Sequence, residues 1–590
     1  MNTVKNVALG ADPKTKDRIN KVTELINRGA TEGEQAAARE ALNRIKEAHP
    51  EVLVIEIKKY LHDELRPHQS SVLEQVKQSK KPYIVTEAPT GFGKSFVPAQ
   101  LAHEGHKVMV LTRAKSLQDQ YGGPPYFADV VKGKATYGCE YNGLKSADLC
   151  KIEPKKDIDT CFCTRDDCTT YCKESSELKG KCLSGCPYPV ACQTMLASNL
   201  GSLNYAKYLT EIRPNGLVGK YGAEYLFLDE CHQLSDLTIE YSGCSLSYEL
   251  HGKPNEFLLS FTKPLELNPL LPLALRINKA VDWLDNLFAA LMKREPKKPN
   301  KLSTENEIKY YKKWDILTRK IGTTIDMVDE GREYWYAESN AEKGFRLKPL
   351  TARFHFRYLF KAPKIVMMSA TVGNPAPFMA ELGIYEDFES IVVPNIWPPS
   401  TRPIVDLHGP KMNYRNTPMQ LEEHAQVIAE ALNECDPAWT GIIHTNSKAK
   451  ANSLCNRLRS LTKRPLWLPP MDVGTEEVLA QWKAYKQHNR GAIALAWNLV
   501  EGVDLGDDQI SIVAWLSWPD FSDQYEKERF DFDPKAGLGR VANHLVQALG
   551  RVRRGRPQDY EPGNNFVALV DANWSRLKSS INSSILESVA

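Results

Sequence analysis

The sequence has no long run of apolar residues and almost no net charge. No stretch of about 18 residues is both apolar and free of charged side chains, which argues against a membrane-spanning helix. The first thirty residues are charged and do not resemble a secretion signal. The chain has 76 basic and 73 acidic residues, a net charge of +3, so any basic groove must be local. We expect an intracellular protein.

Cysteine is scarce outside one stretch of the chain. Nine of the thirteen cysteines fall between Cys139 and Cys192. In a large chain without a secretion signal, such clustering favours metal binding over disulfides. Thiolates suit an iron–sulfur cluster and zinc equally well, so the residue types alone leave the metal open.

The length of 590 residues predicts several domains. Residues 1–60 have the composition of helices and are expected to form a small accessory segment with a capping box at Thr31 and Glu34. From about residue 61 to 240, short apolar strands alternate with helices, which predicts a parallel α/β sheet. Similar strands return over 351–400 and 401–590. The expected strands are Tyr83–Val85, Val108–Leu111, Tyr225–Leu228, Ile365–Met368, Ile442–His444, Ala492–Ala496, Ile510–Trp515 and Phe566–Val570.

Residues 241–350 have a different pattern, typical of long amphipathic helices. A capping box at Thr304 and Glu307 precedes the second of them, and a basic, proline-broken segment at 293–301 separates the two. We expect an inserted helical domain. The apolar positions of the two helices are Ile277, Val281, Leu284, Phe288 and Leu291, then Tyr310, Trp314, Leu317, Ile321 and Ile325.

A phosphate-binding loop is predicted soon after the expected strand Tyr83–Val85. The segment from Ala88 to Ser95 has the glycine spacing and the Lys-Ser ending of such a loop, with Ala88 in place of the usual first glycine. Lys94 would neutralise phosphate charge, and Ser95 would hold Mg²⁺. The residues expected to contact nucleotide are Pro89, Thr90, Gly91, Phe92, Gly93, Lys94 and Ser95.

Two carboxylates end another expected strand. In Leu228-Asp-Glu-Cys-His232, Asp229 is a candidate Mg²⁺ ligand, and Glu230 is a candidate base for the attacking water. An acidic pair after a strand is often only a solvated loop. Beside a phosphate-binding loop, the interpretation as a nucleotide-hydrolysing site is favoured.

These motifs and their order resemble the superfamily 2 DNA helicases of the XPD/DinG type. Asp-Glu-Cys-His resembles the DEAH box. Arg66 and Gln69 resemble the adenine-contacting element, 112–120 the strand-tracking motif, 369–371 the motif that couples hydrolysis to movement, and 445–447 the start of the second motor domain. Residues 501–504, ending in Asp504, resemble the family's fifth motif, and 547–554 resemble its QxxGRxxR motif, with Gln547, Arg551 and Arg554.

The resemblance implies an α/β fold with two RecA-like motor domains. The first would span 61–240 and 351–400, the second 401–590, and an arch-like helical domain would be inserted at 241–350. Arg551 and Arg554 would stabilise the transferring phosphoryl group when the two domains close. The implied activity is ATP-dependent separation of DNA strands with movement from 5′ to 3′, the implied cofactors are ATP and Mg²⁺, and the implied partners are single-stranded and forked DNA. We expect this activity in the cytoplasm of a bacterium, or of a cell that hosts a virus, and not in a nucleus.

The resemblance also implies that the cysteine segment, at about 132–195, holds a 4Fe–4S cluster. Cys139 and Cys186 match the family's first and last ligands by their flanking residues, and Cys172 and Cys182 are the favoured inner pair. The surplus cysteines depart from the family and keep open a zinc site formed by Cys161, Cys163, Cys168 and a fourth ligand, either alone or beside a cluster. Unligated buried thiols are the remaining alternative.

Two other interpretations remain beside the helicase. One is a DNA-stimulated ATPase, a translocase or remodeller that does not separate strands. The other is a metal-bearing nucleic-acid-binding protein with an inactive motor. The basic and aromatic run from Arg353 to Tyr358 suits stacking on a single strand, but equally suits a half-buried strand.

Overall fold

The three-dimensional structure is a computed structural model, and the residues that it describes form two compact units. It describes residues 3–9, 13–28, 32–48, 53–59, 67–89, 92–113, 115–133, 136–137, 187–212, 216–297, 304–340, 344–394, 403–413, 415–470, 473–497, 499, 508–550, 565–581 and 583–589. The first unit draws on residues 1–83, 95–229 and 235–367, and the second on 84–94, 230–234 and 368–590. Among the described helices, none combines the length and the apolar character needed to cross a bilayer.

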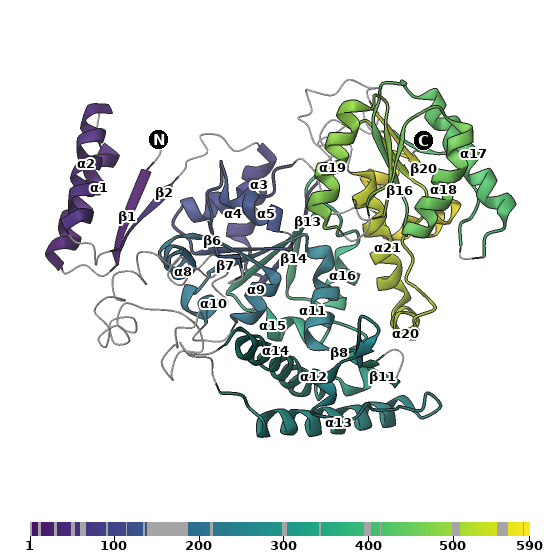
Figure 1. The fold of residues 1–590 in the computed structure, drawn as a ribbon. Coiled ribbons are helices and arrows are strands. Elements are labelled where there is room, and N and C mark those ends of the chain that lie inside the picture. The colour runs from purple at the N-terminus through teal and green to yellow at the C-terminus, as the bar shows by residue number, and fades with distance from the viewer. Residues whose placement is uncertain are drawn as a thin grey trace. The chain divides into compact units, whose positions relative to one another are not determined.

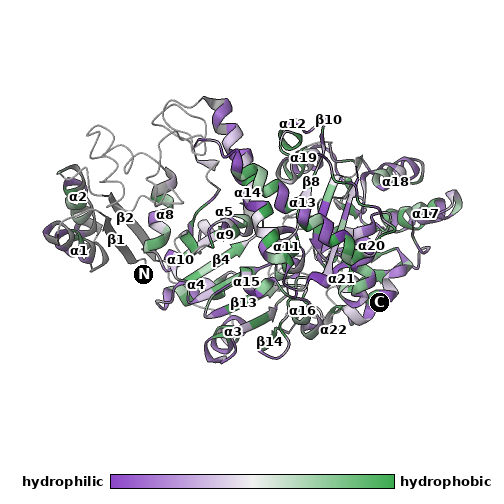
Figure 2. Ribbon diagram, turned by 90° about the horizontal axis from the view of Figure 1, so that it is seen from below, coloured by the Kyte–Doolittle hydropathy of each residue, from purple (hydrophilic) through white to green (hydrophobic). Residues whose placement is uncertain are grey.

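The larger sheet has seven strands in the order β14-β3-β13-β7-β4-β6-β5. Strand β4 pairs in parallel with both β6 and β7. All five residues of β4 are buried, and the strand is coloured as hydrophobic in Figure 2. A strand buried on both faces is typical of a parallel sheet with helices on either side. The strands are β14 (Phe388–Val392), β3 (Tyr83–Glu87), β13 (Lys364–Ser369), β7 (Tyr225–Asp229), β4 (Val108–Thr112), β6 (Leu200–Asn204) and β5 (Asp129–Val130).

Helices cover both faces of this sheet. In Figure 1, α3, α4 and α5 lie above the strands, and α9 and α10 lie below them. Since the faces are covered, loops reach solvent mainly at the strand ends, which is where parallel sheets bind ligands. The helices are α3 (Pro67–Gln78), α4 (Phe96–His103), α5 (Lys115–Gly122), α8 (Pro187–Ala197), α9 (Tyr205–Thr210), α10 (Leu217–Tyr221), α11 (Leu234–Ser242), α15 (Phe356–Leu359) and α16 (Pro375–Glu381).

The second sheet has six strands in the order β15-β20-β19-β16-β18-β17, and every neighbouring pair is parallel. Alternate residues face opposite sides: Ile443 packs with α17 and α18, whereas Ile442 packs with α19. On β20, Val567 packs against α21. The elements are β15 (Ile404–Asp406), β20 (Phe566–Leu569), β19 (Ile510–Val513), β16 (Gly441–His444), β18 (Ile493–Ala496), β17 (Leu466–Trp467), α17 (Pro418–Glu434), α18 (Lys448–Leu461), α19 (Thr475–His488), α20 (Gln524–Phe532), α21 (Pro534–Leu549) and α22 (Ser583–Leu586).

The expected strands of both sheets are confirmed, each within two residues at either end. The sheets are α/β with helices on both faces, as expected for two RecA-like domains. Strand β6 was not expected. Its sequence, Leu-Gly-Ser-Leu-Asn, has two leucines but no β-branched residue, and it contains a glycine, so its preference for a strand is weak.

The insertion at 241–350, between β7 and β13 along the chain, is only partly helical. Helices α13 (Leu273–Lys293) and α14 (Glu305–Val328) are present, and the capping box of Thr304 and Glu307 forms. Beside these helices, β8, β11 and β12 form an antiparallel three-stranded sheet, which the expectation of an inserted helical domain did not include. The remaining elements are β8 (Cys244–Leu246), β9 (Glu249–Leu250), β10 (Lys253–Pro254), α12 (Glu256–Leu259), β11 (Trp335–Asn340) and β12 (Gly344–Pro349).

The first sixty residues contain two strands as well as two helices. Helices α1 (Pro13–Arg28) and α2 (Glu32–Ala48) are present, while β1 (Thr3–Leu9) pairs antiparallel with β2 (Leu53–Lys59). The prediction of helices throughout is therefore corrected. The helical composition of 13–48 hid the fact that its flanks are short apolar runs able to pair with each other.

Candidate active site

The phosphate-binding loop follows β3 and leads into α4. The N–H of Ala88 donates to the carbonyl of Ser369 at 3.0 Å, so Ala88 continues the sheet pairing. Its φ is not positive, which explains why alanine is tolerated where such loops usually have glycine. Gly93 has a φ of +82°, in the left-handed region that glycine adopts readily. Thr90 and Gly91 lie outside the described residues.

The basic end of the loop is turned inward. The ammonium group of Lys94 donates to the carbonyl of Ala88 at 3.5 Å across the loop. Ser95 is the residue before α4, and its side chain makes no capping hydrogen bond to the helix. A serine at the start of a helix commonly makes such a bond. Pro89 and Phe92 are joined by a turn in which the N–H of Phe92 donates to the carbonyl of Pro89 at 3.1 Å.

The acidic pair follows β7 in a strained turn. Asp229 is the last residue of β7 and is buried, and its carbonyl accepts a hydrogen bond from the hydroxyl of Tyr205 at 2.8 Å. Glu230 has φ 52° and ψ 48°, a left-handed conformation that costs a residue with a side chain about 1–2 kcal/mol. Backbone strain of this kind is concentrated at functional sites. The turn directs the chain into the short helix Cys231–Gln233.

A hydrogen-bonded cluster surrounds the carboxylate of Glu230 within the second unit. His232 lies 3.4 Å from this carboxylate and 2.9 Å from the hydroxyl of Ser369, which in turn lies 3.2 Å from the hydroxyl of Thr371. The side-chain amide of Gln547 donates to Glu230 at 3.4 Å and to Thr371 at 3.2 Å. Three motifs that are far apart in sequence therefore meet at one carboxylate.

His232, Ser369 and Thr371 were predicted as parts of motifs, but their direct contacts were not. Tyr205, whose hydroxyl donates to the backbone carbonyl of Asp229, was matched to a family position only by its place after Asn204, and its contact with Asp229 was not predicted. No sequence pattern marks a tyrosine that acts through its hydroxyl on a distant strand end. Its position directly after Asn204, the N-cap of α9, is the one local signal.

The other predicted nucleotide contacts are described only in part. Gln69 is buried on α3. Arg66, Asp504, Arg551 and Arg554 lie outside the described residues.

The predicted metal ligands Cys139, Cys172, Cys182 and Cys186 also lie outside the described residues, as do Cys161, Cys163 and Cys168. In the part of the chain that is described, no group of three or more metal-ligating side chains comes together. The described ends of the segment do meet: the rings of Tyr137 and Tyr188 are 5.5 Å apart, edge to face. In the sequence, each tyrosine is two residues from one of the predicted outer ligands, Cys139 and Cys186.

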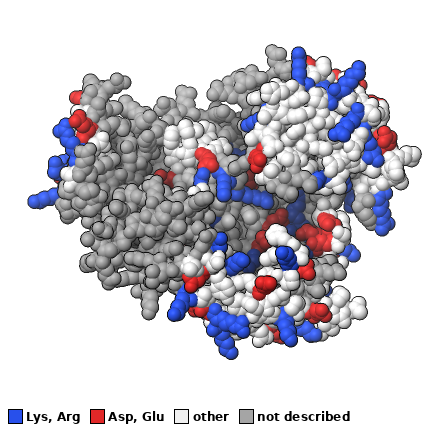
Figure 3. Space-filling model, viewed as in Figure 1, with Lys and Arg blue, Asp and Glu red and all other residues white. Residues whose placement is uncertain are grey.

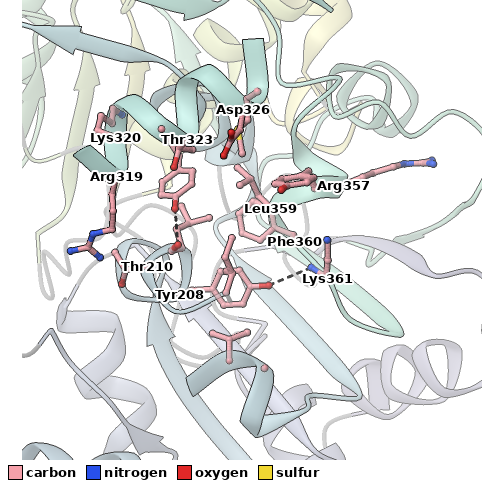
Figure 4. A pocket seen from close by; sticks show the side chains of 18 of the residues that line it. Tyr208, Thr210, Arg319, Lys320, Thr323, Asp326, Arg357, Leu359, Phe360 and Lys361 are labelled. Carbon is pink, nitrogen blue, oxygen red and sulfur yellow. Dashed lines mark hydrogen bonds between the residues drawn. The ribbon is translucent and has the colours of Figure 1, made fainter. Parts of the chain in front are cut away.

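A separate cavity of about 1370 Å³ lies in the first unit, between α14 and the amino ends of the larger sheet's strands. Its lining includes Tyr83 and Ile365, near the starts of β3 and β13, whereas the phosphate-binding loop follows the carboxyl end of β3. Figure 4 shows Tyr208, Arg357 and Lys361 around it. Burial raises the pKa of Tyr208 to about 12, and its hydroxyl accepts from the N–H of Lys361 at 3.3 Å.

The basic and aromatic run at 353–358 contributes to this cavity. It forms a turn and the short helix α15, so the alternative of a half-buried strand is wrong. Phe356 is buried, whereas Arg357 and Tyr358 are exposed and line the cavity. The guanidinium of Arg357 lies 5.5 Å from the ring of Tyr83, and the ammonium of Lys361 lies 4.9 Å from that of Tyr358. The face drawn in Figure 3 carries both basic and acidic side chains among the described residues.

Comparison with known proteins identifies the fold. No protein-family model matches the sequence, and no curated protein matches it. Among solved structures, an XPD helicase matches with a TM-score of 0.52 at 14% identity, over 88% of this chain and 98% of its own. The Xpd4 protein of S. tokodaii matches with a TM-score of 0.50 at 12% identity, over 89% of this chain and 99% of its own. The chain therefore has the fold of the XPD helicases.

Proposed function

We propose that this protein is an ATP-driven DNA helicase that moves along single-stranded DNA from 5′ to 3′ and separates the strands of a duplex. The observation that carries the proposal is the cluster of Glu230, Thr371 and Gln547, which joins the acidic pair to two further motor motifs. The XPD-like fold supports it. We propose the cytoplasm as its place of action.

In the proposed reaction, ATP binds with its phosphates over the loop from Pro89 to Ser95. Lys94 would exchange the Ala88 carbonyl for phosphate oxygens, since a charged acceptor makes the stronger hydrogen bond. Ser95 and Asp229 would hold Mg²⁺. Glu230 would take a proton from the attacking water, with its carboxylate oriented by Gln547.

The remaining nucleotide contacts are proposed from sequence. Arg66 and Gln69 would contact the adenine, and Asp504 would contribute from the second motor domain. Arg551 and Arg554 would stabilise charge on the transferring phosphoryl group once the two motor domains close. The domains proposed for this reaction are 61–240 with 351–400, and 401–590.

We further propose that Cys139, Cys172, Cys182 and Cys186 hold a 4Fe–4S cluster, with zinc as the alternative. Four thiolates complete the coordination of either metal. The approach of Tyr137 and Tyr188 supports a site that closes the segment's two ends. Bound there, the metal would fix the fold of the segment.

The single strand is proposed to contact the cavity beside α14. Exposed Arg357 and Lys361 supply positive charge, and Tyr358 supplies a ring on which a base stacks. Such sites bind single strands with little sequence preference.

A pair of assays tests the proposed function. ATP hydrolysis is measured with and without single-stranded DNA, and strand separation is measured on forked duplexes with one blocked arm. We expect DNA-stimulated hydrolysis, and separation only when the 5′ arm is free. Hydrolysis without separation on any fork would favour a translocase, and absence of hydrolysis would favour a metal-bearing binding protein. The single strands used in the hydrolysis assay have the same length as the strands of the forked duplexes, so that the two assays can be compared.

A further inference from the structure

Helix α21 has two faces with different partners. One face is apolar, and its residues Val541, Leu545 and Ala548 pack into the core with side chains of β19 and β20. The other face carries Arg540 and Gln547. These two residues are seven positions apart, which is about two helical turns, so they lie on the same side of the helix.

Both polar residues contact the segment that follows β13. The side-chain amide of Gln547 donates to the hydroxyl of Thr371 at 3.2 Å and to the carboxylate of Glu230 at 3.4 Å. The guanidinium of Arg540 donates to the carboxylate of Glu381, the last residue of α16, at 3.1 Å. Helix α21 is therefore attached to this segment at two points along one side.

The attachment at Arg540 is a buried ion cluster in which two cations share one carboxylate. The side chain of Glu381 is 11% exposed, and the side chain of Arg540 is 18% exposed. Arg529, on α20, is buried and lies 3.7 Å from the same carboxylate. Burying charges costs desolvation energy that an ion pair seldom recovers, so such a cluster is weak evidence for a role in stability alone. A buried polar contact can instead fix the register in which two helices pack.

We propose that Arg540, paired with Glu381, is a positioning residue for Gln547. An α-helix rises 1.5 Å per residue, so the ion pair fixes α21 at a point about 10 Å from Gln547 along the helix axis. The side-chain amide of Gln547 is thereby held against the carboxylate of Glu230. This inference rests on the proposed function, because it requires that Glu230 acts on the attacking water.

Three substitutions test the contact. Arg540→Gln removes one cation and leaves Arg529 beside the carboxylate, so the buried cluster keeps one charge of each sign. Arg540→Lys keeps the charge but replaces the planar guanidinium by an ammonium group. Gln547→Ala removes the group that is positioned. The matched control is Arg457→Gln, because Arg457, on α18, also joins two helices of the same unit and lies 3.4 Å from Glu422 on α17.

The measurement is steady-state ATP hydrolysis at saturating single-stranded DNA, which gives kcat and the KM for ATP. Thermal unfolding shows whether each variant is folded. Loss of a hydrogen bond to a charged group typically costs about tenfold or more, so we expect kcat to fall about tenfold in Gln547→Ala and in Arg540→Gln. The KM should stay within about twofold of the parental value, because the phosphate-binding loop is untouched. Arg540→Lys should lie between Arg540→Gln and the parent, and Arg457→Gln should keep the parental kcat.

A double variant tests whether Arg540 acts through Gln547. Effects of two residues that act as one unit are not additive. We therefore expect the kcat of Arg540→Gln combined with Gln547→Ala to equal that of Gln547→Ala alone. If Arg540→Gln does not fold, Arg540→Lys replaces it in the same comparison.

Each outcome decides the inference. Parental kcat in both folded Arg540 variants, beside a lowered kcat in Gln547→Ala, would overturn the positioning role and leave the proposed function intact. A further fall in the double variant would also overturn it, because Arg540 would then act by another route, and an equal loss in Arg457→Gln would show general destabilisation instead. Parental kcat in Gln547→Ala would leave nothing to position and would overturn the inference too. Absence of hydrolysis in the parent protein would overturn the proposed function together with this inference.

Discussion

At the scale of single residues, the backbone of Glu230 is the most informative feature of the site. Its left-handed conformation is unfavourable for glutamate, and a glycine there would relieve the strain. The turn brings its carboxylate near His232 and Gln547. We interpret the strain as the cost of holding a carboxylate at a fixed point beside the phosphate-binding loop.

Replacing Glu230 by Gln tests this role without altering the strained turn much. We expect binding of ATP to stay near the parental level, because the loop from Pro89 to Ser95 is untouched. Hydrolysis should fall by at least about 10²-fold, since positioned proton transfer typically contributes that much. Fluorescent-nucleotide titration and a phosphate-release assay measure the two quantities. Lys94→Ala is the comparison and should weaken both; undiminished hydrolysis in Glu230→Gln would contradict the assignment.

His424 supplies a pH prediction. Burial lowers the pKa of this histidine from 6.5 to about 4, with the charge of Lys450 adding to the effect. A depressed histidine pKa means that the unfolded chain binds the proton more readily, so stability is full above pH 6.5 and falls as the pH drops towards 4. When the pH is lowered from 7 to 5, we expect the free energy of unfolding of the region around β16 and β19 to fall by about 2 kcal/mol.

The loss is measured by hydrogen exchange of peptides from β16 and β19, corrected for the pH dependence of the intrinsic exchange rate. His424→Phe is the comparison, because the ring still packs against Trp515, 4.6 Å away in the parent, but cannot be protonated. Its stability should change less over the same pH range. An equal change in parent and variant would assign the effect to other groups.

At the scale of elements, the sequence predicts strands better than it predicts their partners. The strands of the motor sheets are apolar runs bounded by turn residues, so the run of apolar residues alone predicts β4, β7 and β13. Strands β1 and β2 were not predicted, because each is stabilised mainly by pairing with the other, 44 or more residues away along the chain. In the insertion, β8 pairs with β12 at 99 or more residues along the chain, as in Leu246 with Phe345, whereas β11 and β12 are neighbours in the sequence.

The site was predicted to a similar extent. A motif that directly follows a strand is located by that strand, as for Lys94 and Glu230. The contact between Gln547 and Glu230 joins residues 317 positions apart, and no local pattern specifies such a distance. The contact of Tyr205 with Asp229 was not predicted, because the contribution of Tyr205 is a single hydroxyl that reaches the end of a neighbouring strand.

The cysteine segment gives the element-scale prediction. Cys139→Ser or Cys186→Ser should lower the metal content and impair strand separation more than ATP hydrolysis, because the proposed ligands are distinct from the nucleotide contacts. Metal analysis, the absorption spectrum and the two activity assays measure this. Cys192→Ser is the control: Cys192 is buried on α8, after the exit ligand, and should keep its metal. Equal metal content in all three variants would refute the ligand assignment.

At the scale of the whole molecule, the proposed mechanism depends on residues from two RecA-like domains acting on one nucleotide. Gln547, near the end of α21, donates to the carboxylate of Glu230, and Arg551 follows Gln547 by four residues in the sequence. An arginine that stabilises the transferring phosphoryl group acts mainly in the transition state. Its loss should therefore affect rate far more than binding.

Arg551→Ala should lower DNA-stimulated ATP hydrolysis by a factor on the order of 10³, while the affinity for ATP changes much less. Steady-state hydrolysis at saturating single-stranded DNA and nucleotide titration measure the two effects. Lys535→Ala is the matched control, because it removes an exposed cation from the opposite end of α21 and should keep the parental rate. If Arg551→Ala keeps its DNA-stimulated turnover, this arginine does not act on the phosphoryl group, and coupling of hydrolysis to closure of two motor domains would need another residue at its centre.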